Sequence, residues 1–416
     1  MKDIIEDLVF NEEPTVTNYI IKAIGVGGGG CNAIKYLYNQ GVKGCTYIIC
    51  NTDKQVLDDN PVPTKIQLGE GLGAGCDPVI GRNTAIEAEK IIEEAIFDNT
   101  KMLFITAGMG GGTGTGAAPV IASMAKARKI LTVAVVTLPF ENESNETLSK
   151  AIDGIRELEK NVDSLLIINN EKLYEQYGDL LTHEAFPKAD EILATAIRGI
   201  TGIIQETGYM NVDLNDVRKM MTNSGLALLG CGEASGQDRV EKVVDQALNS
   251  PLLNDFDIKT AKNILVNITT GTNEKGLKMI DIKRIQDLIK KTTGSANNFK
   301  QGVVWDDNPE IGDKVKLTVI ATGFNMNDLS KITNLNLGNI IEIDEEFSFQ
   351  SQKQMMADVN AAENESTIRI GYNSINQRTF NFDEGDAPIL TTVNSTNIAS
   401  LENTPAIRRN KNKNNE

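Results

Sequence analysis

Short apolar runs alternate with amphipathic stretches along the first part of the chain. Runs rich in β-branched residues predict buried strands, and apolar residues at helical spacing between them predict helices. The strands are expected at residues 20–26, 47–50, 102–106, 131–138 and 165–168, and the helices at 32–39, 83–97, 117–126 and 149–159. Strands that alternate with helices in this order are typical of an α/β fold with a doubly wound parallel sheet.

The second part of the pattern predicts a long helix and a second, mixed α/β domain. Apolar residues recur at helical spacing over about residues 184–206, which predicts one helix that joins two domains. Beyond it we expect helices at 215–221, 238–248 and 280–291, and strands at 226–231, 264–268, 302–305 and 316–321. After residue 324 the chain is rich in Asn, Ser, Thr and Gln with little apolar periodicity, so a disordered C-terminal tail is expected.

These patterns divide the chain into six segments. They are an N-terminal extension (1–18), a first α/β domain (19–177), a central helix (178–209), a second domain (210–324), a disordered linker (325–402) and a C-terminal peptide (403–416). The last segment carries a local cluster of basic residues on an acidic chain. A length of 416 residues is ample for two domains of ordinary size.

Charge and rare residues narrow the function. The chain has 41 Lys and Arg against 57 Asp and Glu, a net charge of −16, which argues against binding nucleic acid. Its apolar runs are too short to cross a bilayer and its first residues are acidic, so neither membrane insertion nor an export signal is expected. The cysteines lack CxxC spacing and His183 is the single histidine. A zinc centre or a histidine-based triad is therefore not expected.

Two glycine clusters follow predicted strands. In the first, Gly25, Gly27 and Gly30 match a dinucleotide fingerprint, although a glycine turn can also serve packing alone. The second runs from Gly108 to Gly116 and leads into a helix. Neither cluster contains Lys or Arg, so this is not a P-loop. Backbone amides, the Thr113 and Thr115 hydroxyls, helix dipoles and Mg²⁺ would have to hold the phosphates.

The run Gly110-Gly111-Gly112-Thr113-Gly114-Thr115-Gly116 resembles the signature of the tubulin/FtsZ family of GTPases. Matching segments are the first glycine loop and those that begin at Asn51, Gly71, Gly81, Pro139 and Asn211, over about residues 19–324. The resemblance implies a GTP-binding first domain that uses GTP or GDP with Mg²⁺. It also implies a GTPase that polymerises head to tail and forms the cytokinetic ring at the bacterial division site. The protein is then expected in the cytoplasm, at mid-cell.

The resemblance also implies roles for individual residues. Residues that cradle or adjoin the phosphates would be Gly28, Gly29, Gly30, Cys31, Asn32, Asn51, Asp53, Gly73, Ala74, Gly75, Gly110, Gly111, Gly112, Thr113, Gly114, Thr115 and Gly116. Glu143 would bind ribose, Phe186 would stack on guanine, and Asp190 would accept hydrogen bonds from the guanine edge. No protein side chain is assigned to the metal, since Mg²⁺ would be bound mainly through phosphates and water.

The catalytic candidates are Asn211, Asp213 and Asp216. Both carboxylates fall at the start of a helix, where capping of that helix is the alternative role for Asp213. The long helix separates them from the glycine loops by about 30 Å at 1.5 Å per residue. We therefore expect the loop of one subunit to complete the site of the next.

Several positions depart from the family pattern. Thr147 stands where the family has a nucleotide-contacting arginine, and Glu70 precedes the loop 71–75. The C-terminal peptide has Asn403-Thr404-Pro405-Ala406-Ile407-Arg408-Arg409 and lacks the family's aromatic residue. We interpret it as a weakened site for a membrane-tethering adaptor and division regulators, with a solubilising tail as the alternative.

Three other functions would explain some of these sequence features. A nicotinamide-dependent dehydrogenase would use the first glycine cluster and Asp53, but has no use for a second phosphate cradle. A tubulin-like protein that binds GTP without hydrolysing it would fit Thr147 and Glu70, but not the intact Asp213 and Asp216. A filament that segregates plasmids or shapes the cell remains open on the fold alone.

Overall fold

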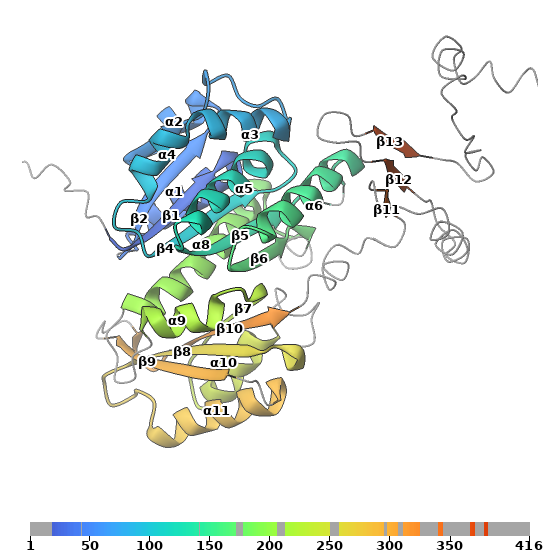
Figure 1. The fold of residues 1–416 in the computed structure, drawn as a ribbon. Helices are drawn as coiled ribbons and strands as arrows, with labels where there is room; N and C mark the ends of the chain where they lie inside the picture. The colour runs from blue at the N-terminus through green and yellow to red at the C-terminus, as the bar shows by residue number, and fades with distance from the viewer. Residues whose placement is uncertain are drawn as a thin grey trace, which may run out of the picture. The chain divides into compact units, whose positions relative to one another are not determined.

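The computed structural model describes residues 19–42, 44–140, 142–171, 178–205, 213–249, 258–294, 298–306 and 311–324, and the backbone of three strands beyond them. Residues 1–333 form one compact unit, which holds a single sheet of ten strands in the order β3-β2-β1-β4-β5-β6-β7-β10-β8-β9 (Figure 1). The strands from β3 to β7 pair in parallel, β10 pairs antiparallel with β7 and β8, and β9 is parallel to β8.

The first part of this unit alternates strands and helices. Its elements are β1 (Ile21–Val26), α1 (Gly27–Asn39), β2 (Thr46–Asn51), α2 (Lys54–Asp58), β3 (Thr64–Gln67), α3 (Pro78–Glu87), α4 (Glu89–Ile96), β4 (Met102–Gly108), α5 (Gly112–Ala127), β5 (Leu131–Leu138), α6 (Asn145–Glu159) and β6 (Ser164–Asn169). The second part contains α8 (Thr182–Gln205), α9 (Leu214–Met221), β7 (Gly225–Ala234), α10 (Arg239–Leu248), a 3-10 turn (Ile258–Thr260), β8 (Asn263–Gly271), α11 (Met279–Thr293), β9 (Asn298–Asp306) and β10 (Val315–Phe324).

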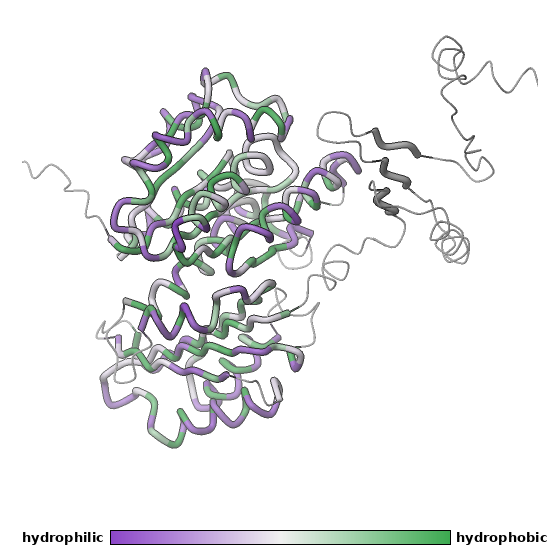
Figure 2. Tube along the Cα trace, viewed as in Figure 1, coloured by the Kyte–Doolittle hydropathy of each residue, from purple (hydrophilic) through white to green (hydrophobic). Residues whose placement is uncertain are grey.

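Helices cover both faces of the sheet. Successive strand side chains point to opposite faces and are apolar on both, so each face needs a layer of helices. On β1, Ile24 and Val26 belong to the core under α3, α4, α5, α6, α10 and α11, whereas Ile21 and Ala23 belong to the core under α1, α2, α8 and α9. In Figure 2, apolar residues gather along the strands inside the unit, and apolar and polar residues alternate along the helices around them. The predicted doubly wound sheet, central helix and mixed second domain are confirmed.

Several helix and strand boundaries predicted from the sequence are wrong. The helices that follow the two glycine clusters begin earlier than expected, at Gly27 and Gly112, so part of each cluster is the first turn of a helix. The helix predicted over 83–97 is two helices, because the backbone leaves helical geometry at Ala88. Strand β3 was missed because only Ile66 of its four residues is buried.

Beyond residue 333 the structure describes three short strands. They are β11 (Ile340–Ile343), β12 (Thr367–Ile370) and β13 (Arg378–Asn381), with β12 parallel to β11 and antiparallel to β13. They lie in the range predicted as a disordered linker, where no strand was expected. The other residues of that range, the N-terminal extension and the C-terminal peptide lie outside the described residues, so the disordered linker stays a prediction.

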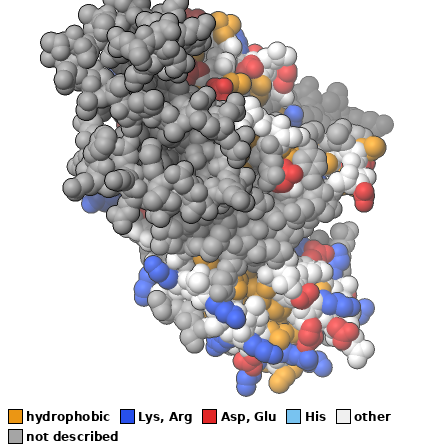
Figure 3. Space-filling view, turned by 90° about the vertical axis from the view of Figure 1, so that its right-hand side faces the viewer, with side chains coloured by type: hydrophobic (Ala, Val, Ile, Leu, Met, Phe, Trp, Pro, Cys, Tyr) orange, Lys and Arg blue, Asp and Glu red, His pale blue; other side chains and the backbone are white. Residues whose placement is uncertain are grey.

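Two surface properties complete the description. Within the described residues, no helix is both long and apolar enough to span a bilayer. On the face shown in Figure 3, basic and acidic side chains are interspersed over the lower part of the described surface. This mixture is what a solvated surface requires, as the charge pattern of the sequence predicts.

Candidate functional site

The two glycine clusters meet where the strand order of the sheet reverses. Strand β1 lies between β2 and β4, and the clusters follow the carboxyl ends of β1 and β4. A Cβ built on Gly30 would lie 2.2 Å from the Thr106 carbonyl oxygen, and one on Gly114 would lie 2.4 Å from that of Gly108. Only glycine allows these backbone contacts. This crevice is the usual ligand position in a doubly wound sheet; we call residues 27–32, 71–75 and 110–116 the cradle.

Two helix N-termini open into the cradle. Helices α1 and α5 have Val26 and Gly111 at their caps, and no side chain there accepts a hydrogen bond from the first turn. A Cβ on Gly28 or Gly111 would meet nothing within 4 Å, so both positions border open space. Free N–H groups at two converging helix ends favour an anion. The structure therefore brings Gly28, Gly29 and Gly30 together with Gly110, Gly111 and Gly112, as predicted.

The loop 71–75 forms a third wall of the cradle. The backbone N–H of Gly73 donates to the Thr52 carbonyl at 2.9 Å, and a Cβ on Gly112 would lie 2.7 Å from Ala74 Cβ. Gly73 and Gly75 border open space. Leu72, between them and β3, is 87% exposed. A large apolar side chain so exposed beside a ligand site is a surface that another molecule can cover.

The threonines of the second cluster are anchored inside the protein. Thr113 Oγ1 lies 2.6 Å from Thr52 Oγ1, and Thr115 Oγ1 accepts a hydrogen bond of 2.8 Å from the Gly110 N–H. Both side chains are buried. These contacts fix the loop 110–116. Thr52 is therefore a structural residue of the site, although no role was predicted for it in the matching segment that begins at Asn51.

Three other predicted phosphate-site residues, Cys31 in the cradle and Asn51 and Asp53 at and just after the end of β2, make contacts within the protein. The Cys31 thiol is buried within reach of the Gly25 and Cys50 carbonyls, and this burial raises its pKa to about 12. Asn51 is buried at the end of β2, where its Oδ1 accepts from the Asp53 N–H. Asp53 caps α2 through the Gln55 N–H at 2.9 Å. Asn32, by contrast, is exposed on α1.

Glu143 lies between β5 and α6, and Thr147 lies at the start of α6, beside the second cluster. Glu143 Oε1 accepts a hydrogen bond of 3.1 Å from the Phe140 N–H, which holds the carboxylate over this turn. Thr147 belongs to the first turn of α6, where Ser144 caps the helix. A Cβ on Gly110 would lie 2.7 Å from Thr147 Cγ2, so this threonine packs directly against the cradle.

Asp190 is the predicted base-reading residue with an unusual environment. It lies on α8, which packs against α1, and its burial raises the pKa of its carboxyl to about 7. A partly buried carboxyl group of this kind can, in its ionised form, accept hydrogen bonds from the donors of a ligand. Phe186 lies on the same helix, and its side chain is outside the described residues.

The two catalytic candidates within the described residues lie far from the cradle. Asp213 caps α9, since its Oδ1 accepts from the Asp216 N–H at 2.7 Å. Arg218 of the same helix donates to the Lys101 and Lys129 carbonyls, which precede β4 and β5. Helix α9 thus lies at the amino ends of these strands, and the cradle lies at the carboxyl ends. The seven residues of β4 separate the two ends by about 20 Å; Asn211 lies outside the described residues.

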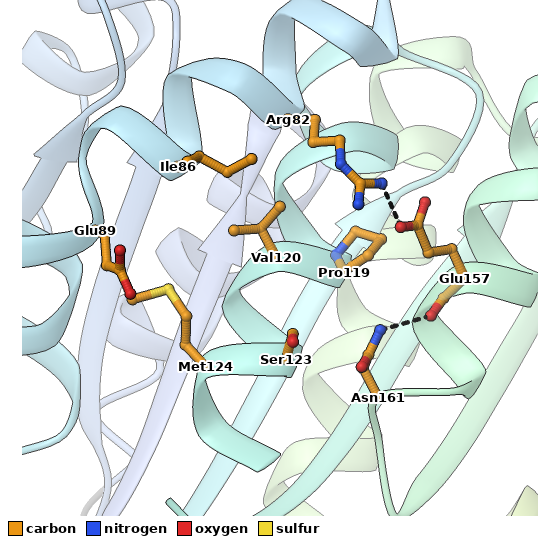
Figure 4. Close-up of a pocket in the computed structure, with 9 residues that line it drawn as sticks. All are labelled: Arg82, Ile86, Glu89, Pro119, Val120, Ser123, Met124, Glu157 and Asn161. Atoms are coloured by element: carbon orange, nitrogen blue, oxygen red, sulfur yellow. Dashed lines mark hydrogen bonds and ion pairs between the residues drawn. The ribbon is translucent and has the colours of Figure 1, made fainter. Parts of the chain in front are cut away.

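A separate pocket of about 230 Å³ lies between α3, α5 and α6 (Figure 4). In this view Arg82 of α3 reaches Glu157 of α6 across Pro119 of α5, and the Asn161 side chain donates to the Glu157 carbonyl at 3.0 Å. None of its lining residues belongs to the cradle. The contacts brace α5 from outside and carry no sign of chemistry.

The donor set suits a metal that arrives with its ligand. Within the described part of the chain, no three His, Cys, Asp or Glu side chains lie close enough together to hold a metal ion. The cradle offers hydroxyl and amide oxygens but no carboxylate, and Mg²⁺ that keeps several waters can use such oxygens together with those of a bound phosphate. Arg218 of α9, which ends the segment that begins at Asn211, and Lys300 of β9 were given no role from the sequence. Their contacts join elements that are far apart in the chain, so only the fold shows them.

Comparison with known proteins agrees with this geometry. Residues 20–178 match the model of the tubulin/FtsZ family GTPase domain, and residues 225–325 match that of the FtsZ family C-terminal domain. The chain is 42% identical over 343 residues to the cell division protein FtsZ of Porphyromonas gingivalis, covering 81% of this chain and 74% of that one. It is 44% identical over 309 residues to the protein of the same name from Pseudomonas putida, covering 73% and 76%.

Solved structures give the same result. The FtsZ dimer of M. jannaschii superposes with a TM-score of 0.68 at 37% identity, covering 74% of this chain and 89% of that one. CetZ1 from Haloferax volcanii, a GDP-bound monomer, gives a TM-score of 0.65 at 19% identity, covering 76% and 96%. At that identity the second match concerns the fold alone.

Proposed function

Because the chain belongs to the FtsZ family of cell division proteins and carries a tubulin/FtsZ GTPase domain, we propose that it binds GTP in the cradle and hydrolyses it between successive subunits of a head-to-tail filament. The filament would form the division ring. Other members of the family have been seen to associate, as in the dimer of M. jannaschii. Membership of this family leaves no place for the dehydrogenase alternative.

The observation that carries the proposal is the position of α9 relative to the cradle. The cradle has the backbone donors for a triphosphate, whereas the catalytic candidates lie about 20 Å away at the opposite edge of the sheet. A side chain at one edge cannot reach a ligand at the other edge of the same subunit. When subunits stack so that the amino ends of the strands in one copy meet the carboxyl ends in the next, α9 of the first copy faces the cradle of the second. The exposed Leu72 lies at that contact.

The residues of this chain then have separate roles. Free N–H groups of α1 and α5 hold the phosphate oxygens, the oxygens of Glu143 accept from the ribose hydroxyls, and Asp190 accepts from guanine N–H donors that adenine lacks. Asp216 of the next subunit orients and polarises the attacking water. When bound through the phosphates, Mg²⁺ would neutralise part of their charge, and Asp53 would lie beside the phosphates and the metal.

The C-terminal peptide and the location of the protein rest on the sequence. The basic residues of the peptide are Arg408, Arg409, Lys411 and Lys413, on a chain of net charge −16. We propose that they attract a membrane-tethering adaptor or division regulator with an acidic surface and so hold a cytoplasmic filament at mid-cell. No nucleic acid is expected as a partner.

Phosphate release measured against protein concentration tests the proposed function. If each site needs two subunits, turnover per subunit should be near zero at low concentration and rise once assembly begins. Sedimentation should show pelleting with GTP and with a non-hydrolysable analogue, and little with GDP. Turnover per subunit that does not change with concentration would show that one subunit suffices and would overturn the shared site.

A further inference from the structure

Lys300 contacts the catalytic candidate Asp216 from a different part of the fold. Its Nζ lies 2.7 Å from Asp216 Oδ1. Lys300 is on β9, at the edge of the sheet, and is paired in register with Leu265, which packs in the core beneath α8 and α9. Paired residues of parallel strands point to the same face, so Lys300 projects toward α9. The contact therefore follows from the register of the sheet.

The contact decides where the Asp216 carboxylate points. Asp216 is the third residue of α9, and its backbone N–H is already bound by the cap residue Asp213 at 2.7 Å. A carboxylate at this position of a helix can turn back and accept from the N–H of the cap, as in a capping box. The ammonium group of Lys300 draws Asp216 away from that arrangement. Asp216 remains 27% exposed and available to a molecule that docks on this edge.

Lys300 also changes the charge that α9 presents. The cradle segments contain no Lys or Arg, and Thr147 adds none beside them. Two carboxylates, Asp213 and Asp216, would meet the phosphates of a nucleotide held there, and like charges repel strongly in a partly desolvated interface. One ammonium group beside Asp216 halves the negative charge of that pair.

We propose that Lys300 is a positioning residue for GTP hydrolysis: it orients the Asp216 carboxylate and offsets its charge as α9 enters the nucleotide site of the neighbouring subunit. This inference rests on the proposed function, in which Asp216 acts in trans. It assigns to β9, an edge strand of the second domain, a part in a reaction whose substrate lies in the first domain of another copy.

Steady-state hydrolysis by full-length Lys300→Met, Lys300→Arg and Lys314→Met tests it. Lys314→Met is the matched control, because Lys314 pairs with Glu233 at 3.1 Å on the same domain and is equally exposed, at 49%. We expect Lys300→Met to lower kcat about fivefold with KM for GTP and pelleting unchanged, and Lys300→Arg to restore most of the rate. The deficit should shrink between about 50 mM and about 500 mM salt, because salt screens the pair.

The outcomes separate the inference from its premise. If Asp216→Ala abolishes hydrolysis while Lys300→Met keeps the wild-type kcat, Lys300 does not position Asp216 and the inference alone is wrong. If Lys300→Met and Lys314→Met lose the same amount, the effect is one of general surface charge and the inference is equally wrong. If Asp216→Ala itself keeps the wild-type rate, the proposed function fails first.

Discussion

The cradle and α9 are built in different ways. The cradle consists of backbone held at contact distance, with glycines at Gly30 and Gly114 where any Cβ would collide with a carbonyl oxygen. The α9 edge consists of side chains that reach toward solvent, held by the cap of α9, the ion pair of Asp216 with Lys300 and the hydrogen bonds of Arg218. The first region supplies backbone donors, whereas the second presents carboxylates about 20 Å away from them. This difference supports the proposal that a complete site takes residues from two copies.

The largest effect should come from the rigid region. A Cβ in Gly114→Ala would lie 2.4 Å from the Gly108 carbonyl oxygen, so we expect a loss of about 2–3 kcal/mol in the free energy of unfolding. Gly28→Ala is the matched change, because its Cβ meets nothing within 4 Å. It should alter stability by less than about 1 kcal/mol yet weaken GTP binding, since its methyl group enters the space proposed for the phosphates.

Urea unfolding and GTP titration separate these two variants. If Gly114→Ala unfolds at the wild-type urea midpoint, the cradle is not the close-packed backbone described above. If Gly28→Ala binds GTP as the wild type does, the open space beside α1 does not hold the phosphates.

A smaller, graded effect is expected at Asp190. Burial raises the pKa of its carboxyl to about 7, and guanine donors need the ionised form, so binding must release the proton. GTP affinity should therefore fall by up to about tenfold per pH unit below pH 7 and level off above it. Asp190→Asn should remove this slope. An equal slope in wild type and variant, measured by titration at several pH values, would assign the dependence to another group.

The same pKa predicts how the nucleotide-free protein responds to pH. The pKa in the folded state is above the ordinary 3.8, so protonation of Asp190 stabilises the fold fully below about pH 4. That contribution is lost as the pH rises toward 7. The Tm of Asp190→Asn minus that of the wild type should therefore be more positive at pH 8 than at pH 4.

The glycines of the cradle could be predicted from the sequence because close backbone contacts require glycine, and glycine clusters are visible in the sequence. Glycines that follow apolar strands have few explanations, and the order of strands and helices placed both clusters at one edge of the sheet. The sequence missed the helical start at Gly112 because glycine is a poor helix former, and here packing against Ala74 and Gly81 overrides that preference.

The α9 edge was only partly predictable. The motif from Asn211 to Arg218 marked its carboxylates, and the length of the predicted central helix indicated that they lie far from the cradle. The contact between Lys300 and Asp216 depends on the pairing of β9 with β8, which no local pattern encodes. Long-range register, rather than composition, decides which charges meet there.

Mixing two defective variants tests the shared site most directly. Gly111→Asp adds a carboxylate to open space at the cap of α5, where Asp is tolerated by the helix but repels phosphate. Asp216→Ala keeps the cradle and removes the catalytic candidate. Each variant alone should release almost no phosphate from GTP, and an equimolar mixture should regain a substantial part of the wild-type rate. A mixture that stays inactive although both variants sediment together, or full activity of Asp216→Ala alone, would contradict a site completed by the neighbouring subunit.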